Sequence, residues 1–433
     1  MKPVYFSFAL IGLLGILLAG CGQVSPTAIE QLISPSAMAD VSSPVIESPT
    51  ADASPARVVS TPQEINPHEL PSPQPVLLPN GITSNTGDGL GVSFFAPDGL
   101  ALGEIRLPED TWSARNSMHA AGGNTGRPDF PLVLFRSEFE GNCDECGVWL
   151  LNQDQATLLL HINEMEGLVG VPASDQVAFV ERTYLLDDNI LRSNLYLGNP
   201  ASLPASEPVL VLDSNESMVL VPVAIAMNAE APVGIWYTQR PYGIGGEIVF
   251  DPQHGLYYLD LATNSSIEIL SPSSAFSSLS ASQTLAAYSA MPPQTAGIVV
   301  RTLASNEEVV FQCLPDSDRG AGSAVISPDD IHLAWLEARG SLVDDNFHAT
   351  VRVASLDGQS IRDYPQEYFV KAAGLGEEIW VTPLGWLDNT SLLVGVRSMG
   401  KDSQSINLRL DTLTDEVSYL AAGVFAGFIY AGN

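Results

Sequence analysis

Two cysteines separated by two residues, Cys143 and Cys146, have the spacing in this sequence that is most readily linked to metal or redox chemistry. A structural zinc site needs about four ligands, and the sequence has no second pair of this kind. A thioredoxin-like pair follows a strand and opens a helix, whereas this one is flanked by Gly141 and Gly147 in a turn-rich segment. We therefore expect a local disulfide, with free thiols or a partial metal site as alternatives. Cys313 ends an apolar run and is expected to be a buried hydrophobic residue.

Carboxylates recur in the segments that we expect to form loops. The sequence Asp-Asp-Asn occurs at corresponding places in two units, and further acidic residues fall in loops of the same face. We call these residues the acidic rim: Asp187, Asp188, Glu216, Asp344, Asp345, Glu377 and Glu378. Carboxylate oxygens are the ligands that Ca²⁺ prefers, although no EF-hand loop is present. We expect the rim either to bind a cation or a basic partner, or to carry only solvated charge.

Other motifs that support catalysis are missing from the sequence. There is no G-x-S-x-G motif for a serine nucleophile and no glycine motif that would cradle a phosphate. The six histidines lie in unrelated segments. The sequence therefore predicts a protein that is not an enzyme and needs no cofactor.

The charge balance is strongly acidic, with 18 Lys and Arg against 50 Asp and Glu and a net charge of −32. Such a surface is repelled by nucleic acid and by anionic lipid headgroups. We expect no nucleic-acid partner and no membrane binding through surface charge.

The N-terminus has the pattern of a secretory signal, with Lys2 followed by an apolar run over residues 4–18. The sequence Leu18-Ala19-Gly20-Cys21 resembles the lipobox of bacterial lipoproteins. The resemblance implies cleavage before Cys21 and lipidation of its thiol. More than one acyl chain gives stable anchoring, so we expect attachment to a bacterial membrane of the cell envelope, facing outside the cytoplasm. An uncleaved anchor helix is the alternative.

Four segments of the chain differ in composition. Residues 1–20 are the expected signal peptide, and residues 21–86 are rich in Pro, Ser and Thr without a sustained period. A segment of this composition buries too little apolar surface to offset its ordering entropy, so we expect a disordered tether that begins at the lipidated cysteine. Residues 87–129 form a lead-in without a clear assignment, and residues 130–433 the folded domain.

From about residue 90 the chain consists of short apolar runs separated by Gly, Pro, Asn, Asp and Ser. This pattern indicates many short antiparallel strands and an all-β fold. The strands group into five units of four, and in four units a polar turn precedes a strand that contains an aromatic residue: Phe179, Trp236, Tyr288 and Trp335. These aromatics recur roughly every 50 residues, which is typical of four-stranded β-propeller blades.

Two stretches resemble the repeats of TolB-type propellers. Residues 326–337, Ile-Ser-Pro-Asp-Asp-Ile-His-Leu-Ala-Trp-Leu-Glu, are similar to the S-P-D-G core of such repeats, with Asp330 in place of the glycine. Residues 256–270 resemble their D-x-x-T-G half. The resemblance covers roughly residues 130–430 and implies a propeller. It implies no partnership like that of TolB, whose N-terminal α/β domain has no counterpart in this sequence.

The two ends of the folded region predict how the propeller closes. Residues 131–136, 146–152 and 156–161 supply three strands, and residues 423–432 supply one more. Together they predict a sixth blade in which the C-terminal strand is innermost, beside residues 133–135. We therefore expect a six-bladed β-propeller of four-stranded antiparallel blades closed by the C-terminal strand, which removes an open sheet edge. Residues 87–129 would pack on a face or form part of a seventh blade.

The innermost strands of this propeller are expected to be apolar. They contain no Asp, Glu, Asn or His, and comprise residues 168–171, 218–226, 275–279, 323–326, 379–384 and 424–430. This composition argues against a central catalytic metal. The sequence thus predicts a monomeric, lipid-anchored binding or scaffold module for an envelope protein or glycan. The alternative is a secreted propeller hydrolase with a cation at the acidic rim.

Overall fold

The described part of the chain lies within Ala53–Asn433. The computed structural model describes residues 57–58, 70–86, 91–106, 117–121, 132–137, 147–152, 155–162, 164–171, 176–185, 190–199, 208–214, 218–229, 231–241, 250, 253–290, 297–315, 319–340, 347–376, 379–398 and 403–430. None of the helices in these ranges has the length and hydrophobicity needed to span a membrane.

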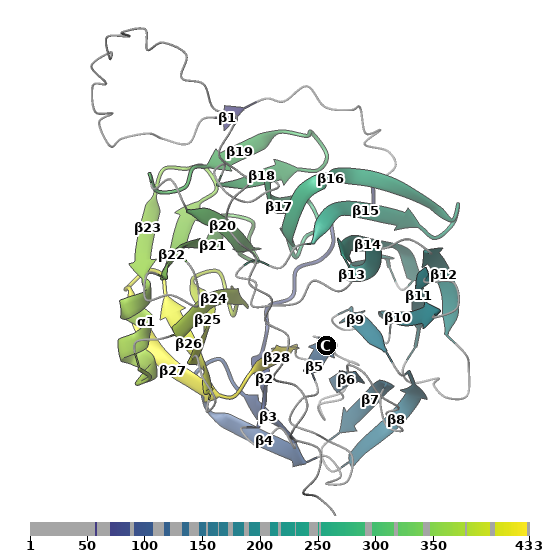
Figure 1. The fold of residues 1–433 in the computed structure, drawn as a ribbon, viewed down its shortest axis with the longest axis horizontal. Coiled ribbons are helices and arrows are strands. Elements are labelled where there is room, and N and C mark those ends of the chain that lie inside the picture. Colours follow the sequence, from purple (N-terminus) through teal and green to yellow (C-terminus); the bar gives the residue numbers. More distant parts are fainter. Residues whose placement is uncertain are drawn as a thin grey trace, which may run out of the picture. The chain divides into compact units, whose positions relative to one another are not determined.

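Antiparallel strands make up almost all of the described structure, with one short helix, α1 (Gln366–Ala373) (Figure 1). The strands form six sheets, five with four strands and one with eight. Four sheets join strands that are consecutive in the chain: β5 (Ser117–Ala121), β6 (Leu132–Ser137), β7 (Gly147–Asn152) and β8 (Gln155–His161); β9 (Met165–Gly170), β10 (Val177–Leu185), β11 (Ile190–Gly198) and β12 (Val209–Ser214); β20 (Gly320–Ile326), β21 (His332–Arg339), β22 (His348–Ser355) and β23 (Ile361–Pro365); and β24 (Ile379–Trp386), β25 (Ser391–Ser398), β26 (Ser405–Asp411) and β27 (Glu416–Ala422).

The eight-stranded sheet combines two groups of four strands that share β16, with β1 as the eighth strand at one edge. Its strands, from one edge to the other, are β13 (Met218–Asn228), β14 (Ala231–Pro241), β15 (His254–Asp260), β16 (Ser265–Leu279), β17 (Leu285–Ala290), β18 (Ile298–Thr302), β19 (Glu308–Phe311) and β1 (Arg57–Val58). Residues 265–270 of β16 pair with β15, whereas residues 274–279 pair with β17. The five four-strand units expected from the sequence are therefore all present.

The C-terminal strand β28 (Phe425–Ile429) completes a different sheet from the expected one. It pairs with β2 (Gly81–Asn85), which is followed by β3 (Gly91–Phe95) and β4 (Ala101–Arg106). The prediction that it lies beside residues 133–135 was wrong, because β5 occupies that position next to β6. The additional strands come from the expected tether and lead-in. When β16 is counted in both of its groups and β1 is left aside, the described strands give seven groups of four.

Consecutive groups pack against one another in chain order (Figure 1). Contacts join β28 to β5, β5 to β9, β9 to β13, β16 to β20 and β20 to β24. Leu384 and Leu393 also share one hydrophobic cluster with Phe425 and Phe428 of β28. Sheets of four strands that follow one another around a centre are the arrangement of a β-propeller.

Apolar side chains fill the spaces between neighbouring sheets. The four aromatics that mark the repeat, Phe179, Trp236, Tyr288 and Trp335, are between 0% and 8% exposed. Trp335 of β21 shares its cluster with Phe311 of β19, in the preceding group. Burying a side chain of the size of Phe179 contributes about 1.5–3 kcal/mol. The loose aromatic repeat of the sequence thus corresponds to residues that hold adjacent sheets together.

The Ser-Pro-Asp-Asp sequence forms the hairpin between β20 and β21. The Ser327 hydroxyl donates a hydrogen bond to Asp329 Oδ1 at 2.6 Å. The same hydroxyl oxygen accepts a hydrogen bond from the backbone N–H of His332. Asp330 has a φ of 56°, in the left-handed region that favours the glycine of the repeat. Its carboxylate accepts hydrogen bonds from Ser282 and Thr284 of the preceding hairpin. The departure from glycine therefore adds a link between two sheets.

Candidate functional site

The site residues expected from the sequence lie outside the described ranges. This holds for the lipidation residue, the disulfide candidates and the whole acidic rim: Cys21, Cys143, Cys146, Asp187, Asp188, Glu216, Asp344, Asp345, Glu377 and Glu378. Their roles remain predictions. Among the residues that are described, His, Cys, Asp and Glu form no group that could hold a metal ion. Cys313 is partly buried beside Phe311, and burial raises the pKa of its thiol to about 11.

The innermost strands are less uniformly apolar than the sequence suggested. β5 contains His119 and β9 contains Glu166, and neither position was assigned to an innermost strand. The Glu166 side chain is 2% exposed and pairs with Arg182 at 2.8 Å and with Arg240. A buried carboxylate is tolerated where its ion-pair partners offset the cost of its desolvation. Glu166 is therefore already committed to an ion-pair cluster.

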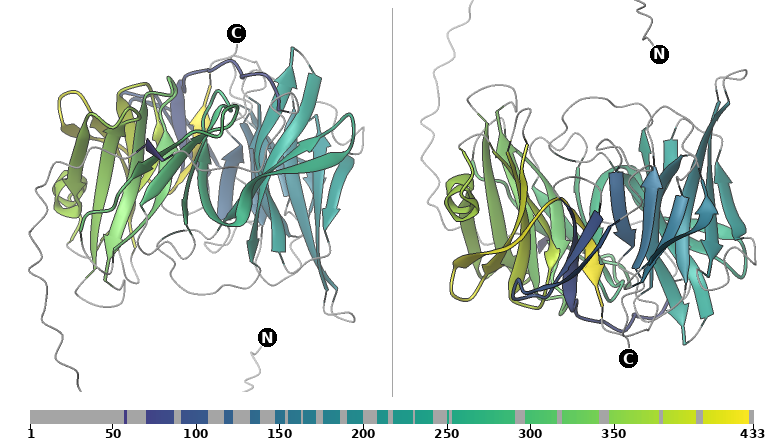
Figure 2. Two further views of the ribbon diagram at one scale, coloured as in Figure 1. Left: turned by 90° about the horizontal axis from the view of Figure 1, so that it is seen from above. Right: turned by 90° about the horizontal axis from the view of Figure 1, so that it is seen from below.

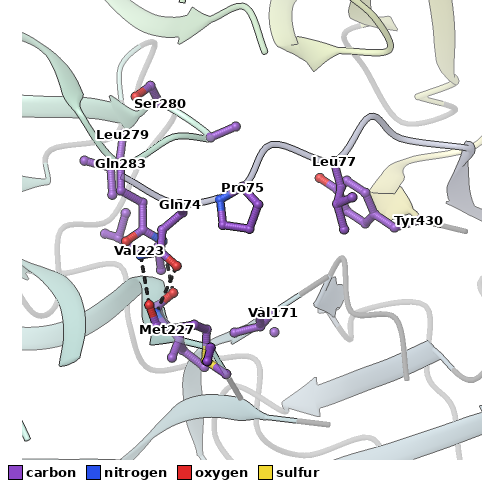
Figure 3. Close-up of a pocket in the computed structure, with 15 residues that line it drawn as sticks. Gln74, Pro75, Leu77, Val171, Val223, Met227, Leu279, Ser280, Gln283 and Tyr430 are labelled. Carbon is purple, nitrogen blue, oxygen red and sulfur yellow. Dashed lines mark hydrogen bonds between the residues drawn. The ribbon is translucent and has the colours of Figure 1, made fainter. Parts of the chain in front are cut away.

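A cavity of about 440 Å³ lies where several innermost strands end (Figure 3). Its walls come from the ends of β9 and β13, from the hairpin between β16 and β17, and from Tyr430 after β28. An extended segment, residues 70–80, contributes the remaining wall through Gln74, Pro75 and Leu77. We call this segment the strap. It passes over one end of the strands before the chain enters β2 (Figure 2).

The strap is fixed mainly by Gln74. The Met227 backbone N–H donates to Gln74 Oε1 at 3.0 Å, and Gln74 Nε2 donates to the Met227 carbonyl at 3.2 Å (Figure 3). β13 is an edge strand of its described sheet, so no neighbouring strand pairs with the side of Met227 that faces the strap. The backbone N–H of Gln74 also donates to the Ser282 carbonyl at 2.8 Å. A side-chain amide thus supplies the pairing that the end of β13 lacks.

The hairpin between β16 and β17 is held against β13 by a second amide. Gln283 has a φ of 58°, and its side chain reaches β13 and β14 of the same eight-stranded sheet. Gln283 Oε1 accepts from Trp236 Nε1 at 2.8 Å, and Gln283 Nε2 donates to the Ile225 carbonyl at 3.0 Å. Both polar ends of this amide are satisfied, so the residue shapes the cavity wall.

The cavity lining is neutral. Apolar side chains such as Val171, Val223 and Leu279 alternate with amides, Ser280 and backbone groups. Tyr430 is the one titratable side chain in the lining, and burial raises its pKa to about 12. Its hydroxyl is therefore protonated near neutral pH and can donate a hydrogen bond. This arrangement can bind a neutral or mostly apolar group.

The strap lies within the segment predicted to be a disordered tether, so this site was not expected from the sequence. The strap contains four of the prolines of the Pro-rich segment and has no strand or helix period. Its one local signal is the amide of Gln74 within Pro-Gln-Pro. Such a residue is recognised as a contact only once the end of β13 is placed beside it.

No family model matches this sequence, and no curated protein is similar to it in sequence. Solved structures with a similar arrangement of strands include a TolB-type protein from Agrobacterium tumefaciens, which is 11% identical with a TM-score of 0.38 over 67% of this chain and 89% of that one. An oligogalacturonate lyase from Vibrio parahaemolyticus is 10% identical, with a TM-score of 0.44 over 81% and 86% of the two chains. A puromycin-hydrolyzing peptidase from Mycobacterium tuberculosis is 17% identical, with a TM-score of 0.38 over 57% and 36%. None of these similarities assigns an activity to this chain.

Proposed function

We propose that this chain is a lipid-anchored, extracytoplasmic β-propeller that binds a protein or glycan partner of the cell envelope and catalyses no reaction. The binding role depends on one observation, the cavity of about 440 Å³ beneath the strap. Ligand sites in proteins commonly enclose about 300–1,000 Å³ and combine apolar walls with a few polar groups. In this proposal the seven groups of strands are seven blades, and β28 closes the ring by joining β2.

The lining favours binding over catalysis. General acid–base catalysis works best when a side chain has a pKa near the operating pH. The cavity offers only Tyr430 for such a role, and burial raises the pKa of Tyr430 to about 12. Ser280 is the one lining side chain with a hydroxyl of the nucleophilic type, and it accepts hydrogen bonds from the backbone of Thr284 and Leu285 within its own hairpin. These groups suit recognition of an uncharged segment.

The lipid anchor rests on the sequence Leu18-Ala19-Gly20-Cys21. Replacing Cys21 with serine removes the thiol that would carry the lipid. Cells that express Cys21→Ser should fail to incorporate a palmitate analogue into the protein, and the protein should move from the membrane to the soluble fraction. Unchanged labelling and membrane retention would disprove the anchor while leaving the cavity proposal intact.

Site-specific photo-crosslinking tests the binding site. Ala281 is exposed and lies in the cavity lining, whereas Ala262 is exposed in the hairpin between β15 and β16 and does not line the cavity. A photoreactive amino acid at position 281 of the full-length protein in intact cells should give a discrete crosslinked product, and the same probe at position 262 should not. Equal crosslinking from both positions, or none from position 281, would reject the cavity as the binding site.

A further inference from the structure

The strap has the features of a ligand that belongs to the chain itself. Four of its eleven residues are proline, at positions 71, 73, 75 and 79. Such a segment is biased toward an extended, polyproline-like conformation and loses little conformational entropy when it binds. The backbone N–H of Asn80 donates to the Ile429 carbonyl at 2.6 Å, and this bond fixes the end of the strap next to β28.

The middle of the strap is held by few contacts. Gln74 provides the bonds to Met227 and Ser282, whereas Val76 and Leu78 are 38% and 49% exposed. The cavity beside Gln74, Pro75 and Leu77 is not filled by them. Segments with few buried contacts open at a low free-energy cost. The strap therefore covers the site without occupying all of it.

We propose that the cavity binds an extended, proline-containing peptide segment of a partner protein that presents a Gln or Asn side chain, and that this segment displaces the strap. The incoming amide takes over both bonds to Met227. A primary amide is suited to this position because it carries a donor and an acceptor side by side, as a peptide group does. The proposal rests on the proposed function, since it names the partner class of the same cavity.

If an external peptide must displace the strap, Gln74 should weaken the binding of that peptide. The strap is tethered beside its site, so its effective concentration is high and it competes with a free peptide. The apparent affinity for that peptide is reduced in proportion to the fraction of molecules in which the site is covered. Replacing Gln74 with alanine weakens the strap only, because an external peptide brings its own amide.

The experiment uses the full-length protein and a labelled synthetic peptide with the sequence of residues 70–80, Leu-Pro-Ser-Pro-Gln-Pro-Val-Leu-Leu-Pro-Asn. We expect Gln74→Ala to bind this peptide roughly tenfold more tightly than the wild type, in line with the loss of two competing hydrogen bonds. A control peptide with leucine in place of the glutamine should bind Gln74→Ala about tenfold more weakly. Equal affinity of the two proteins, equal affinity for the two peptides, or no binding at all would overturn the proposal.

Two further variants guard against a folding artefact. Leu77→Ala trims the strap without removing its hydrogen bonds, so it should strengthen peptide binding in the same direction but by less. Ala281→Tyr in the Gln74→Ala background adds a large side chain to the cavity lining and should abolish peptide binding. If crosslinking from position 281 captures a partner but the peptide does not bind, the cavity is a site for another class of ligand. If the peptide binds but position 281 captures no partner, the proposed envelope function fails separately.

Discussion

At the scale of single residues, one buried acidic group links two neighbouring sheets. Glu337 is completely buried. It pairs with Arg352 at 2.7 Å and accepts from Trp335 Nε1 at 3.0 Å. Arg352 also donates to the Gln312 carbonyl, just after β19 of the preceding group. A charge in this setting is tolerated only because its partners are in place.

We expect Arg352→Leu to lower the free energy of unfolding by about 3–5 kcal/mol, because it leaves the Glu337 carboxylate buried without its closest cation. Urea denaturation measures this loss. Arg362 is the matched control, since it pairs with Asp415 while both side chains are about half exposed. Arg362→Leu should change stability by at most about 1 kcal/mol. Similar losses in the two variants would contradict the assignment of Glu337 as a buried structural charge.

Asp388, in the hairpin between β24 and β25, makes the stability of the folded protein depend on pH. Burial alone would raise the pKa of its carboxyl, but hydrogen bonds from Thr390 and Ser391 outweigh burial and leave the pKa below its usual value of 3.8. Both backbone N–H groups donate to Asp388 Oδ1 at 2.7 Å. A carboxyl whose pKa is lowered by folding stabilises the native state above the unfolded pKa, and this contribution is lost as pH falls through the folded pKa.

We therefore expect Asp388→Asn to be less stable than the wild type at neutral pH and to lose less of its stability on acidification. Thermal unfolding measured between about pH 6 and pH 2 tests this, since the two curves should converge at the acid end. Parallel curves over the whole range would show that Asp388 does not contribute to the acid response.

At the scale of elements, the turns were the most predictable features. Asp260 in the Asp-Leu-Ala-Thr-Asn turn accepts from the backbone of Thr263 at 2.7 Å, and Asp411 accepts from the backbone of Thr414 at 3.0 Å in a related turn. Asn264, at the glycine position of the repeat, has a φ of 52°. These motifs satisfy local hydrogen bonds, so a short window of sequence is enough to recognise them.

The positions of the strands in the sequence were easier to predict than the strands with which they pair. β16 runs for 15 residues through two groups, although the sequence shows only two apolar runs separated by serines and a proline. β28 was correctly expected to be the last strand, but its partner β2 lies in a segment that reads as linker. Pairing over such a separation depends on long-range contacts such as the bond from Thr83 Oγ1 to the Gly427 carbonyl at 3.1 Å. A local pattern does not contain this information.

Gly423 makes the approach of β28 to β2 sterically feasible. Its φ is 96°, and a Cβ at this position would overlap the backbone carbonyl of Asn85. We expect Gly423→Ala to lower the free energy of unfolding by about 3 kcal/mol or more, from backbone strain together with overpacking. Gly374→Ala is the matched control, because Gly374 has a φ of 67° but open space around it. Gly374→Ala should lower the free energy of unfolding by only about 1–2 kcal/mol. Equal losses in the two variants would show that β28 can shift away from β2 to make room for a Cβ at position 423.

At the scale of the whole molecule, segments far apart in sequence meet at the cavity. The strap comes from the Pro-rich region, Met227 from the centre of the chain and Tyr430 from its last described residues. Composition, anchor motif and repeat could be read from the sequence alone, and they predicted a propeller with a binding role. The cavity could not, because it exists only where the ends of several strands are brought under the strap.

The most direct test of the account is a capture experiment that compares two substitutions of exposed turn alanines. Full-length wild type, Ala281→Tyr and Ala262→Tyr are crosslinked chemically in intact cells, and the partner bound to each is quantified by mass spectrometry. A tyrosine at position 281 adds a large side chain to the cavity lining, so we expect it to reduce the captured partner at least roughly tenfold, as a steric block of a binding pocket should. Ala262→Tyr should capture as much as the wild type. Undiminished capture by Ala281→Tyr would contradict the central claim that the cavity beneath the strap is the binding site.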